Sequence, residues 1–233
     1  MVIQSDDYII LDGVSSNTIG LYCDTPPVPP MARQRYTVYQ TGAEQDGTTP
    51  DNSFEDMEIP VNLFTFLDED FDNSAVYQYL YNKSRLELSR HEGFYYKIRQ
   101  VTVSQPQEIA DGRRIGYSVT FTVAPFRYLT ENAAIAVNSG DLVSNSGTYY
   151  SRPVIAITGS GDITLTVNGR EFHLYDVSGT VTVDSERHIC YNGSTVIYNK
   201  DSGSYPLLAV GENLIEYTGN VTAVSLVKNE RCF

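Results

Sequence analysis

Short runs in which apolar and polar residues alternate, separated by turn signals, fill the second half of this chain. Residues 163–167 alternate apolar side chains with threonine, Asn168-Gly169 follows, and residues 172–174 resume the alternation. Asn-Gly between two such runs is typical of a β-hairpin, because a type I′ turn needs a positive φ at both central positions. Further turns are expected at 178–179, 192–193 and 218–220. Six or more short strands within roughly 100 residues predict a β-sandwich.

The first half of the chain carries strand signals that are less regular. Its clearest strand is 115–123, where apolar side chains take alternate positions and polar ones face the other way, as in a half-buried antiparallel strand. We expect this half to form a β-sandwich or barrel-like domain with one short helix. The other strands expected in it are 8–11, 19–22, 35–41, 58–66, 85–89 and 95–104.

Three segments of the first half depart from the strand pattern. Residues 75–82 favour a helix, with Asn73 or Ser74 as its cap and apolar residues four positions apart. The prolines of 25–30 exclude a helix or a central strand, so an extended loop or edge arm is expected there. The Gly- and Thr-rich stretch 42–50 is expected to be a long exposed loop.

The chain changes character near its middle. A length of 233 residues exceeds the usual size of one domain. Between Pro125 and Ser146 the alternation gives way to turn-forming residues. We therefore place a boundary near residue 130, which predicts domains at 1–130 and 131–233. The 18 tyrosines favour a mainly β fold for both, since aromatic residues suit a pleated, half-buried surface.

Net charge limits the partners. The formal charge is −13, from 29 acidic and 16 basic side chains. Such an excess of negative charge opposes tight binding to a phosphate backbone, so specific recognition of nucleic acid is not expected. A channel wall past which DNA slides without sticking is a hypothesis that fits the same charge.

The N-terminal segment and the cysteines indicate the compartment. The first residues lack a basic region and a long apolar core, so they do not predict a signal peptide. No apolar stretch approaches the roughly 20 residues of a membrane span, so we expect a protein made in a cytoplasm. Cys23, Cys190 and Cys232 are odd in number and form no CxxC, which favours reduced thiols over a disulfide framework or a zinc site.

The three histidines lack the sequence patterns of active sites. His91, His173 and His188 accompany no nucleophile-elbow motif and show no HxxxH or HxH spacing. His173 alternates with Phe172 and Leu174, so we expect its side chain to face solvent. No catalytic or metal-ligating histidine is therefore predicted.

An acidic string before the predicted helix resembles the start of a calcium-binding loop. Asp68, Asp70 and Asp72 have the alternating spacing of an EF-hand. Asn73 stands where that loop needs glycine, and Tyr79 stands where it needs a bidentate carboxylate. A solvated loop that caps the helix is the better interpretation, and no metal site is predicted.

The sequence thus predicts no catalytic, cofactor-binding or metal-binding residues, and we do not expect an enzyme. A hydrolase stays an alternative, because paired carboxylates meet only in space. A carbohydrate-binding module for host adhesion is another, in which exposed tyrosines such as Tyr149 or Tyr150 would stack on sugars. The chain has no tryptophan, so we favour cores and protein interfaces as the role of its tyrosines.

Several stretches, in order, resemble siphophage distal tail proteins, the Dit family. The opening 7–36 has the strand, the Asp-Gly turn and the Pro-containing stretch of that family. The segment 153–174 has a G-x-G strand and an Asn-Gly hairpin, 180–193 has an Asp-Ser corner, and 205–232 has an L-x-x-G-x-N motif. The resemblance extends over nearly the whole chain.

This resemblance implies a structural virion protein, assembled in the cytoplasm of a bacterial host. The N-terminal domain would form a hexameric ring around the tail channel, and the C-terminal domain would be a galectin-like β-sandwich outside it. The ring would join the tail tube to the adsorption apparatus of a long, non-contractile tail. The implied partners are the tail tube, the tape measure, a tail-associated lysin or fibre, and a receptor-binding protein.

The resemblance also suggests where subunits meet and what is absent. Residues 25–30 and 42–56 become candidates for contacts between subunits. No large insertion is present, which predicts a simple tail tip without an elaborate docking arm. Sugar binding does not follow from the galectin-like fold, because galectins stack sugars on a tryptophan and fold alone is a poor guide to function.

Overall fold

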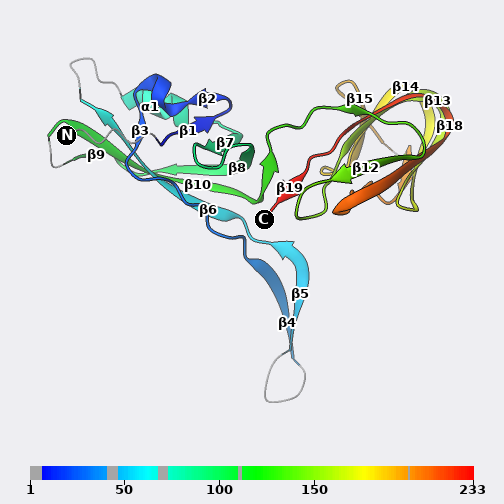
Figure 1. Ribbon diagram of the computed structural model, residues 1–233, viewed down its shortest axis with the longest axis horizontal. Helices are drawn as coiled ribbons and strands as arrows, with labels where there is room; N and C mark the ends of the chain where they lie inside the picture. Colours follow the sequence, from blue (N-terminus) through cyan, green and yellow to red (C-terminus); the bar gives the residue numbers. More distant parts are fainter. Residues whose placement is uncertain (1–6, 41–46, 68–72, 110–111, 199) are drawn as a thin grey trace. The chain divides into compact units, whose positions relative to one another are not determined.

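A computed structural model describes residues 7–40, 47–67, 73–109, 112–198 and 200–233. The chain divides into two compact units, Met1–Tyr128 together with Phe233, and Leu129–Cys232 (Figure 1). The expected mainly β architecture is confirmed, since strands make up most of both units. Among the described residues there is one α-helix, and no helix combines the length and apolar character needed to span a bilayer.

The first unit is built on one large sheet. Its strand order is β2 (Val14–Ser15), β1 (Ile9–Leu11), β7 (Arg85–Leu88), β8 (Phe94–Val103), β10 (Arg114–Leu129), β6 (Met57–Phe66) and β3 (Tyr22–Cys23). The short β9 (Gln107–Glu108) also pairs with β10. A separate two-stranded sheet joins β4 (Gln34–Tyr39) to β5 (Gly47–Phe54).

The centre of this sheet follows the predicted alternation. β10 and β6 pair antiparallel in unbroken register from Arg114 opposite Phe66 to Val123 opposite Met57. Tyr117, Val119 and Phe121 are buried and pack with apolar side chains of β6, which explains why the alternation was visible in the sequence. The strand continues six residues beyond the predicted end at 123, through Pro125 to Leu129.

The predicted helix is confirmed as α1 (Asn73–Leu80). Val76, Tyr79 and Leu80 are buried against the sheet, and the Tyr79 hydroxyl lies 3.1 Å from the carbonyl oxygen of Ile9 and 3.0 Å from that of Val14, so its single hydrogen is shared between the two. The buried phenol is thus hydrogen-bonded to the backbone near the first hairpin.

Two predictions for the first half were wrong. The strand expected at 19–22 begins too early: Ile19 ends a 3-10 helix, η1 (Ser16–Ile19), and Gly20 follows it with φ 72°. Only Tyr22 and Cys23 then pair with β6. The loop expected at 42–50 was wrong for residues 47–50, which belong to β5; residues 41–46 lie outside the described residues.

The second unit contains three long strands, β13 (Val154–Val167), β14 (Arg170–Asp184) and β18 (Gly211–Val227). The first half of β18 pairs with β12 (Asp141–Asn145), and its second half pairs with β11 (Ile135–Ala136). The first half of β14 pairs with β17 (Asp201–Gly203), and its second half pairs with β15 (Ile189–Asn192), which continues to β16 (Thr195–Ile197). Each long strand therefore takes part in two layers, and the layers enclose one apolar core.

The long strands change layer at a band of glycines and small polar residues. The β13–β14 register shifts between Gly161 and Ile163, and the β13–β18 register shifts beside it. At Gly219, φ is 106° and an added Cβ would lie 2.5 Å from the carbonyl oxygen of Asp162. Only glycine fits such a bulge, and bulges increase local twist and bend the strands.

Two of the predicted turns were wrong, because the strands bend at these positions and do not end there. Residues 178–179 and 218–220 lie inside the continuous strands β14 and β18 instead of separating shorter ones. The hairpins at Asn168-Gly169 and at residues 192–193 are confirmed, and Asn168 and Gly169 have φ of 50° and 76°. The predicted sandwich is thus made by bending a few long strands as well as by turns.

A buried asparagine holds the start of β18. Asn213 is fully buried, and its Nδ2 donates to the carbonyls of Val143 (3.2 Å), Ala209 (2.9 Å) and Gly211 (2.8 Å). Its Oδ1 accepts from Ala209 N and from Asn168 Nδ2, both at 2.7 Å. The asparagine of the L-x-x-G-x-N motif therefore has a structural role: it ties β18 to β12 and to the Asn168 hairpin.

Candidate functional site

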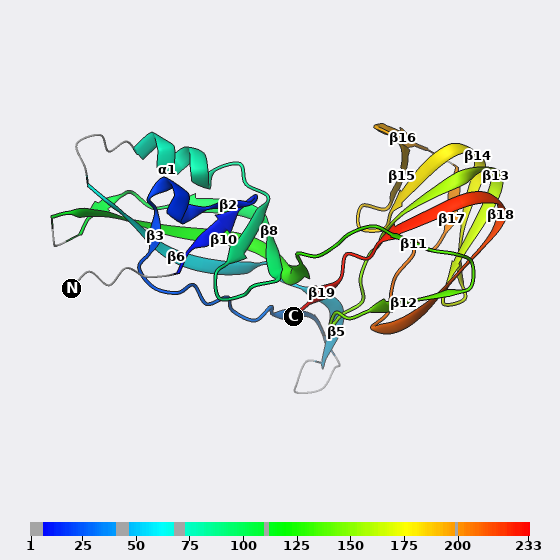
Figure 2. The same ribbon diagram turned by 45° about the horizontal axis from the view of Figure 1, so that its top comes forward.

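The β4–β5 hairpin, which we call the arm, extends away from the large sheet of the first unit (Figures 1 and 2). Its strands pair with each other, Thr37 opposite Thr49 and Val38 opposite Thr48, and with no other described strand. A two-stranded hairpin standing alone in water is marginally stable at best. The arm is therefore the part of the first unit that most needs a partner.

One face of the arm is apolar and exposed. Tyr36 and Val38 share this face with Pro50, because Tyr36 pairs with Pro50 and side chains alternate along a strand. Tyr36 is 57% exposed and Val38 is 61% exposed. Exposed apolar side chains that lie side by side on an isolated sheet mark a contact surface more often than a free one.

Three phenylalanines form the base of the arm. Phe54, at the end of β5, lies with its ring centroid 5.4 Å from that of Phe126 and 5.0 Å from that of Phe233. Phe126 and Phe233 are themselves 5.3 Å apart. These tilted and edge-on contacts fix one end of the arm to the first unit.

A groove of about 340 Å³ lies beside the base of the arm. Met31 and Arg33 line it together with three carboxylates, from Glu55, Asp56 and Glu58. Met31 is 87% exposed. The predicted proline-rich stretch leads into this groove, and residues 26–33 have no regular secondary structure, which confirms the expected extended segment.

The residues considered for chemistry are dispersed. His91 lies 3.5 Å from the Tyr96 hydroxyl, His188 stacks on the ring of Tyr205, and His173 contacts Thr164 Oγ1 at 3.1 Å. His173 alternates with the buried Phe172 and Leu174 and keeps 33% of its side chain exposed, so it lies on the solvent-facing side of β14 as expected. Within the described ranges no three His, Cys, Asp or Glu side chains gather as metal ligands. Asp68, Asp70 and Asp72 lie outside the described residues.

The three cysteines are buried free thiols, as the sequence predicts. Burial, with a smaller contribution from the charge of Asp7, raises the pKa of the Cys23 thiol to about 12. Burial, with a contribution from Asp201, raises the pKa of the Cys190 thiol to about 12 as well. Both groups are protonated at neutral pH and are poor nucleophiles.

The two tyrosines proposed as a sugar platform are not exposed. Tyr149 and Tyr150 are half-buried, with ring centroids 4.4 Å apart. The guanidinium of Arg231 lies 5.2 Å from the first ring and 4.6 Å from the second, and Arg231 Nε donates to the Tyr150 carbonyl (2.7 Å). Arg231 already covers these rings, so stacking on sugar is not supported here.

The arm was only partly visible in the sequence. The resemblance placed subunit contacts at 25–30 and 42–56, which overlaps the groove and β5. The apolar face on β4 was missed, because a run such as 35–41 looks the same whether its apolar side chains are buried or exposed. The structure adds the two missing facts: β4 and β5 pair only with each other among the described strands, and Tyr36 and Val38 stay exposed.

Comparisons with known proteins address the fold. No protein-family model matches the sequence, and no curated protein matches it significantly. The crystal structure of SPP1 Dit (gp 19.1), described as a paradigm of the hub adsorption apparatus in phages that infect Gram-positive bacteria, is similar with a TM-score of 0.62. The match covers 97% of this chain and 98% of that one at 13% sequence identity. The described units therefore share a Dit-like fold.

Proposed function

We propose that this protein is a structural hub of a phage tail tip and has no enzymatic role. The observation that carries the proposal is the likeness to SPP1 Dit, which runs through both units instead of a single domain. A common sandwich alone would imply little about function. A likeness that covers 97% of this chain, together with an arm that pairs with no other described strand, fits an assembly protein.

In this proposal the first unit closes into a ring of six, and the arm makes the contact between neighbours. The apolar face of Tyr36 and Val38 would lie on the adjacent subunit, and the acidic groove at Glu55 and Asp56 would take basic side chains from it. Such a contact joins two different surfaces of one protein, so it generates a ring when the rotation closes.

The negative charge has a role in the proposed ring. A channel bounded by acidic side chains lets DNA pass without binding, because phosphates are repelled. The second unit, proposed to be a galectin-like sandwich on the outside, would meet the other tail-tip proteins. The tail tube and tape measure would contact the ring, and a lysin, fibre or receptor-binding protein would attach further out.

The arm provides the test. Light scattering and negative-stain images of the wild-type protein should show rings with the mass of six 26.0 kDa chains. The double variant Tyr36→Glu/Val38→Glu places charge on the apolar face and should leave monomers. Thr37→Glu adds charge to the same strand on the opposite face, so it serves as the matched control and should still form rings.

Two outcomes would contradict separate parts of the proposal. A wild-type protein that stays monomeric at high concentration, and that fails to join purified tail tubes, would contradict the hub. Rings that persist in the double variant would retain the hub but remove the arm from the contact between subunits.

A further inference from the structure

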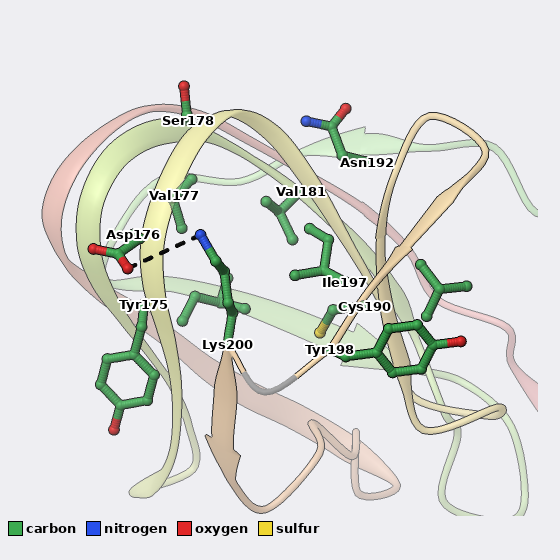
Figure 3. A pocket seen from close by; sticks show the side chains of 12 residues that line it. Tyr175, Asp176, Val177, Ser178, Val181, Cys190, Asn192, Ile197, Tyr198 and Lys200 are labelled. Carbon is green, nitrogen blue, oxygen red and sulfur yellow. Dashed lines mark ion pairs between the residues drawn. The ribbon is translucent and has the colours of Figure 1, made fainter.

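A cavity of about 460 Å³ opens at one edge of the second unit, between β14 and the β15–β16 hairpin (Figure 3). Val177 and Val181 of β14 point toward it, as do Cys190 of β15 and Ile197 of β16. The first three are buried. The cavity therefore reaches the apolar core of the sandwich.

The charges at the cavity are paired with each other. Asp176 and Lys200 are its charged lining residues, and Lys200 Nζ lies 3.9 Å from Asp176 Oδ2 on one side of the cavity. The remaining polar lining groups, among them Ser178 and Asn192, are neutral and lie toward the outside. A charged ligand would lose its hydration without gaining a free counter-charge, so the interior suits uncharged apolar groups.

The strand beside the cavity has an open edge. β14 pairs with β17 up to Leu174, the Tyr175 amide donates to the Lys200 carbonyl (2.8 Å), and pairing with β15 starts at Thr182. Between these points, residues 177–181 pair with β13 on one side and with no described strand on the other. An open edge presents backbone donors and acceptors ready to pair with another strand.

We propose that the cavity and the open edge of β14 at 177–181, which together we call the corner, bind an extended, uncharged segment of a partner protein. This segment pairs with the open edge and places aliphatic side chains in the cavity. Strand addition takes its affinity from the main chain and its specificity from pockets for alternate side chains, and both elements lie side by side here. The inference stands apart from the proposed ring, because the arm belongs to the other unit.

A saccharide fits the cavity less well. The side chains that point toward the cavity are aliphatic ones and Cys190, and the Tyr175 ring points away from the cavity while its hydroxyl lies 2.9 Å from Ser202 Oγ. Sugar sites combine aromatic faces with several convergent polar groups. The open backbone edge can pair with another strand, and a sugar would leave this pairing capacity unused.

A defined peptide tests the proposal. The probe is a nine-residue peptide that alternates threonine with valine and leucine between terminal lysines, titrated calorimetrically into the full-length protein. Two controls have the same composition: one groups the apolar residues together, and the other carries N-methyl groups on alternate backbone amides. The protein controls are Ile197→Lys, which charges a side chain that points toward the cavity, and Thr195→Lys, which places the same charge on an exposed position of the same strand outside the lining.

Saturable binding of the alternating peptide is expected. Both control peptides should bind at least about tenfold more weakly, and Ile197→Lys should weaken the binding of the alternating peptide by a similar factor. Thr195→Lys should bind normally, and hydrogen exchange of residues 177–181 should slow on binding. The variant Tyr36→Glu/Val38→Glu should also bind normally, which separates this result from that of the ring. No binding at millimolar peptide would overturn the proposal. Equal binding of the N-methylated peptide would also overturn it, by revealing an apolar pocket that does not pair with strands.

Discussion

The arm of the first unit and the open corner of the second unit are both incomplete pieces of sheet, but they lack different things. The arm has its backbone paired within the hairpin, while Tyr36 and Val38 remain exposed. At the corner, Val177 and Val181 are buried, while the backbone edge of β14 has no described partner on one side. One surface offers side chains and the other offers a backbone edge. A β-protein can thus carry two kinds of contact that do not compete for the same partner.

Removing the arm should give the largest effect. If Tyr36 to Asn52 are replaced by a short Gly-Ser link, ring assembly should be lost completely. The thermal midpoint of unfolding should change by no more than about 2 °C, because no other described strand pairs with the arm. Light scattering and calorimetry measure the two quantities. A large fall in the midpoint would mean that the arm belongs to the folding core, and the contrast with the corner would then fail.

The corner, in contrast, belongs to the folded core of the second unit, so it should depend on the stability of that unit. Asn213→Ala removes the amide that joins β18 to β12 and leaves several buried backbone groups without a partner. The free energy of unfolding should fall by about 3 kcal/mol in urea titrations. Asn220→Ala is the matched control: this exposed asparagine bonds to Ser160 Oγ, and its loss should cost less than about 0.5 kcal/mol. Equal losses in both variants would show that Asn213 is not a special support.

Glu230 adds a pH dependence to the second unit. Its carboxylate accepts hydrogen bonds from Ser146 N (2.7 Å) and Lys228 Nζ (2.8 Å). Burial alone would raise the pKa of Glu230, but these bonds outweigh it and lower the pKa below the ordinary 4.5. A lowered pKa in the folded state stabilises the protein above the unfolded pKa, and this stability is lost as the pH falls through the folded value.

Glu230→Gln should therefore lower stability by about 1–2 kcal/mol at pH 7, since hydrogen bonds to a charged group are lost. The difference between wild type and variant should shrink as the pH falls from about 5 through the lowered folded pKa of Glu230, in urea titrations at several pH values. A difference that is constant over this range would refute the linkage. Ring formation should be unaffected by the variant at neutral pH.

The smallest effect is expected from filling the cavity. Ile197→Phe places a larger apolar side chain in the cavity and should leave stability unchanged or raise it by up to about 1 kcal/mol. The same variant should block the alternating peptide. Thr195→Phe, at an exposed position of the same strand, controls for added apolar surface. A loss of more than about 1 kcal/mol in Ile197→Phe would mean that the cavity is not open to an added side chain.

The sequence predicted the parts of the fold in which local pattern and burial agree. β6, β10 and α1 have apolar residues at the spacing of the element that they form. Gly179 and Gly219 were misread as turns because a glycine with positive φ also occurs inside a bent strand. The pairing of β13 with β14 and β18 decides between the two, and those partners are distant in sequence.

The two proposed surfaces were harder to predict for the same reason. β5 carries the sequence GTTPDNSF, which has little strand propensity, and it is a strand because β4 pairs with it. The cavity is lined from β14, β15, β16 and the residues before β17, so no single window of sequence contains it. What a sheet leaves unpaired is a property of the whole sheet.

Phe233 belongs to the first unit although the second unit precedes it in the chain. A ribosome adds roughly 5–20 residues per second, so the sheet of the first unit can begin to fold several seconds before Phe233 is available to complete the aromatic base of the arm. During that interval Phe54 and Phe126 lack their third ring. Because of this order of synthesis, the arm would be fully anchored only after the second unit has emerged from the ribosome. Each chain would then fold first and associate with other chains later.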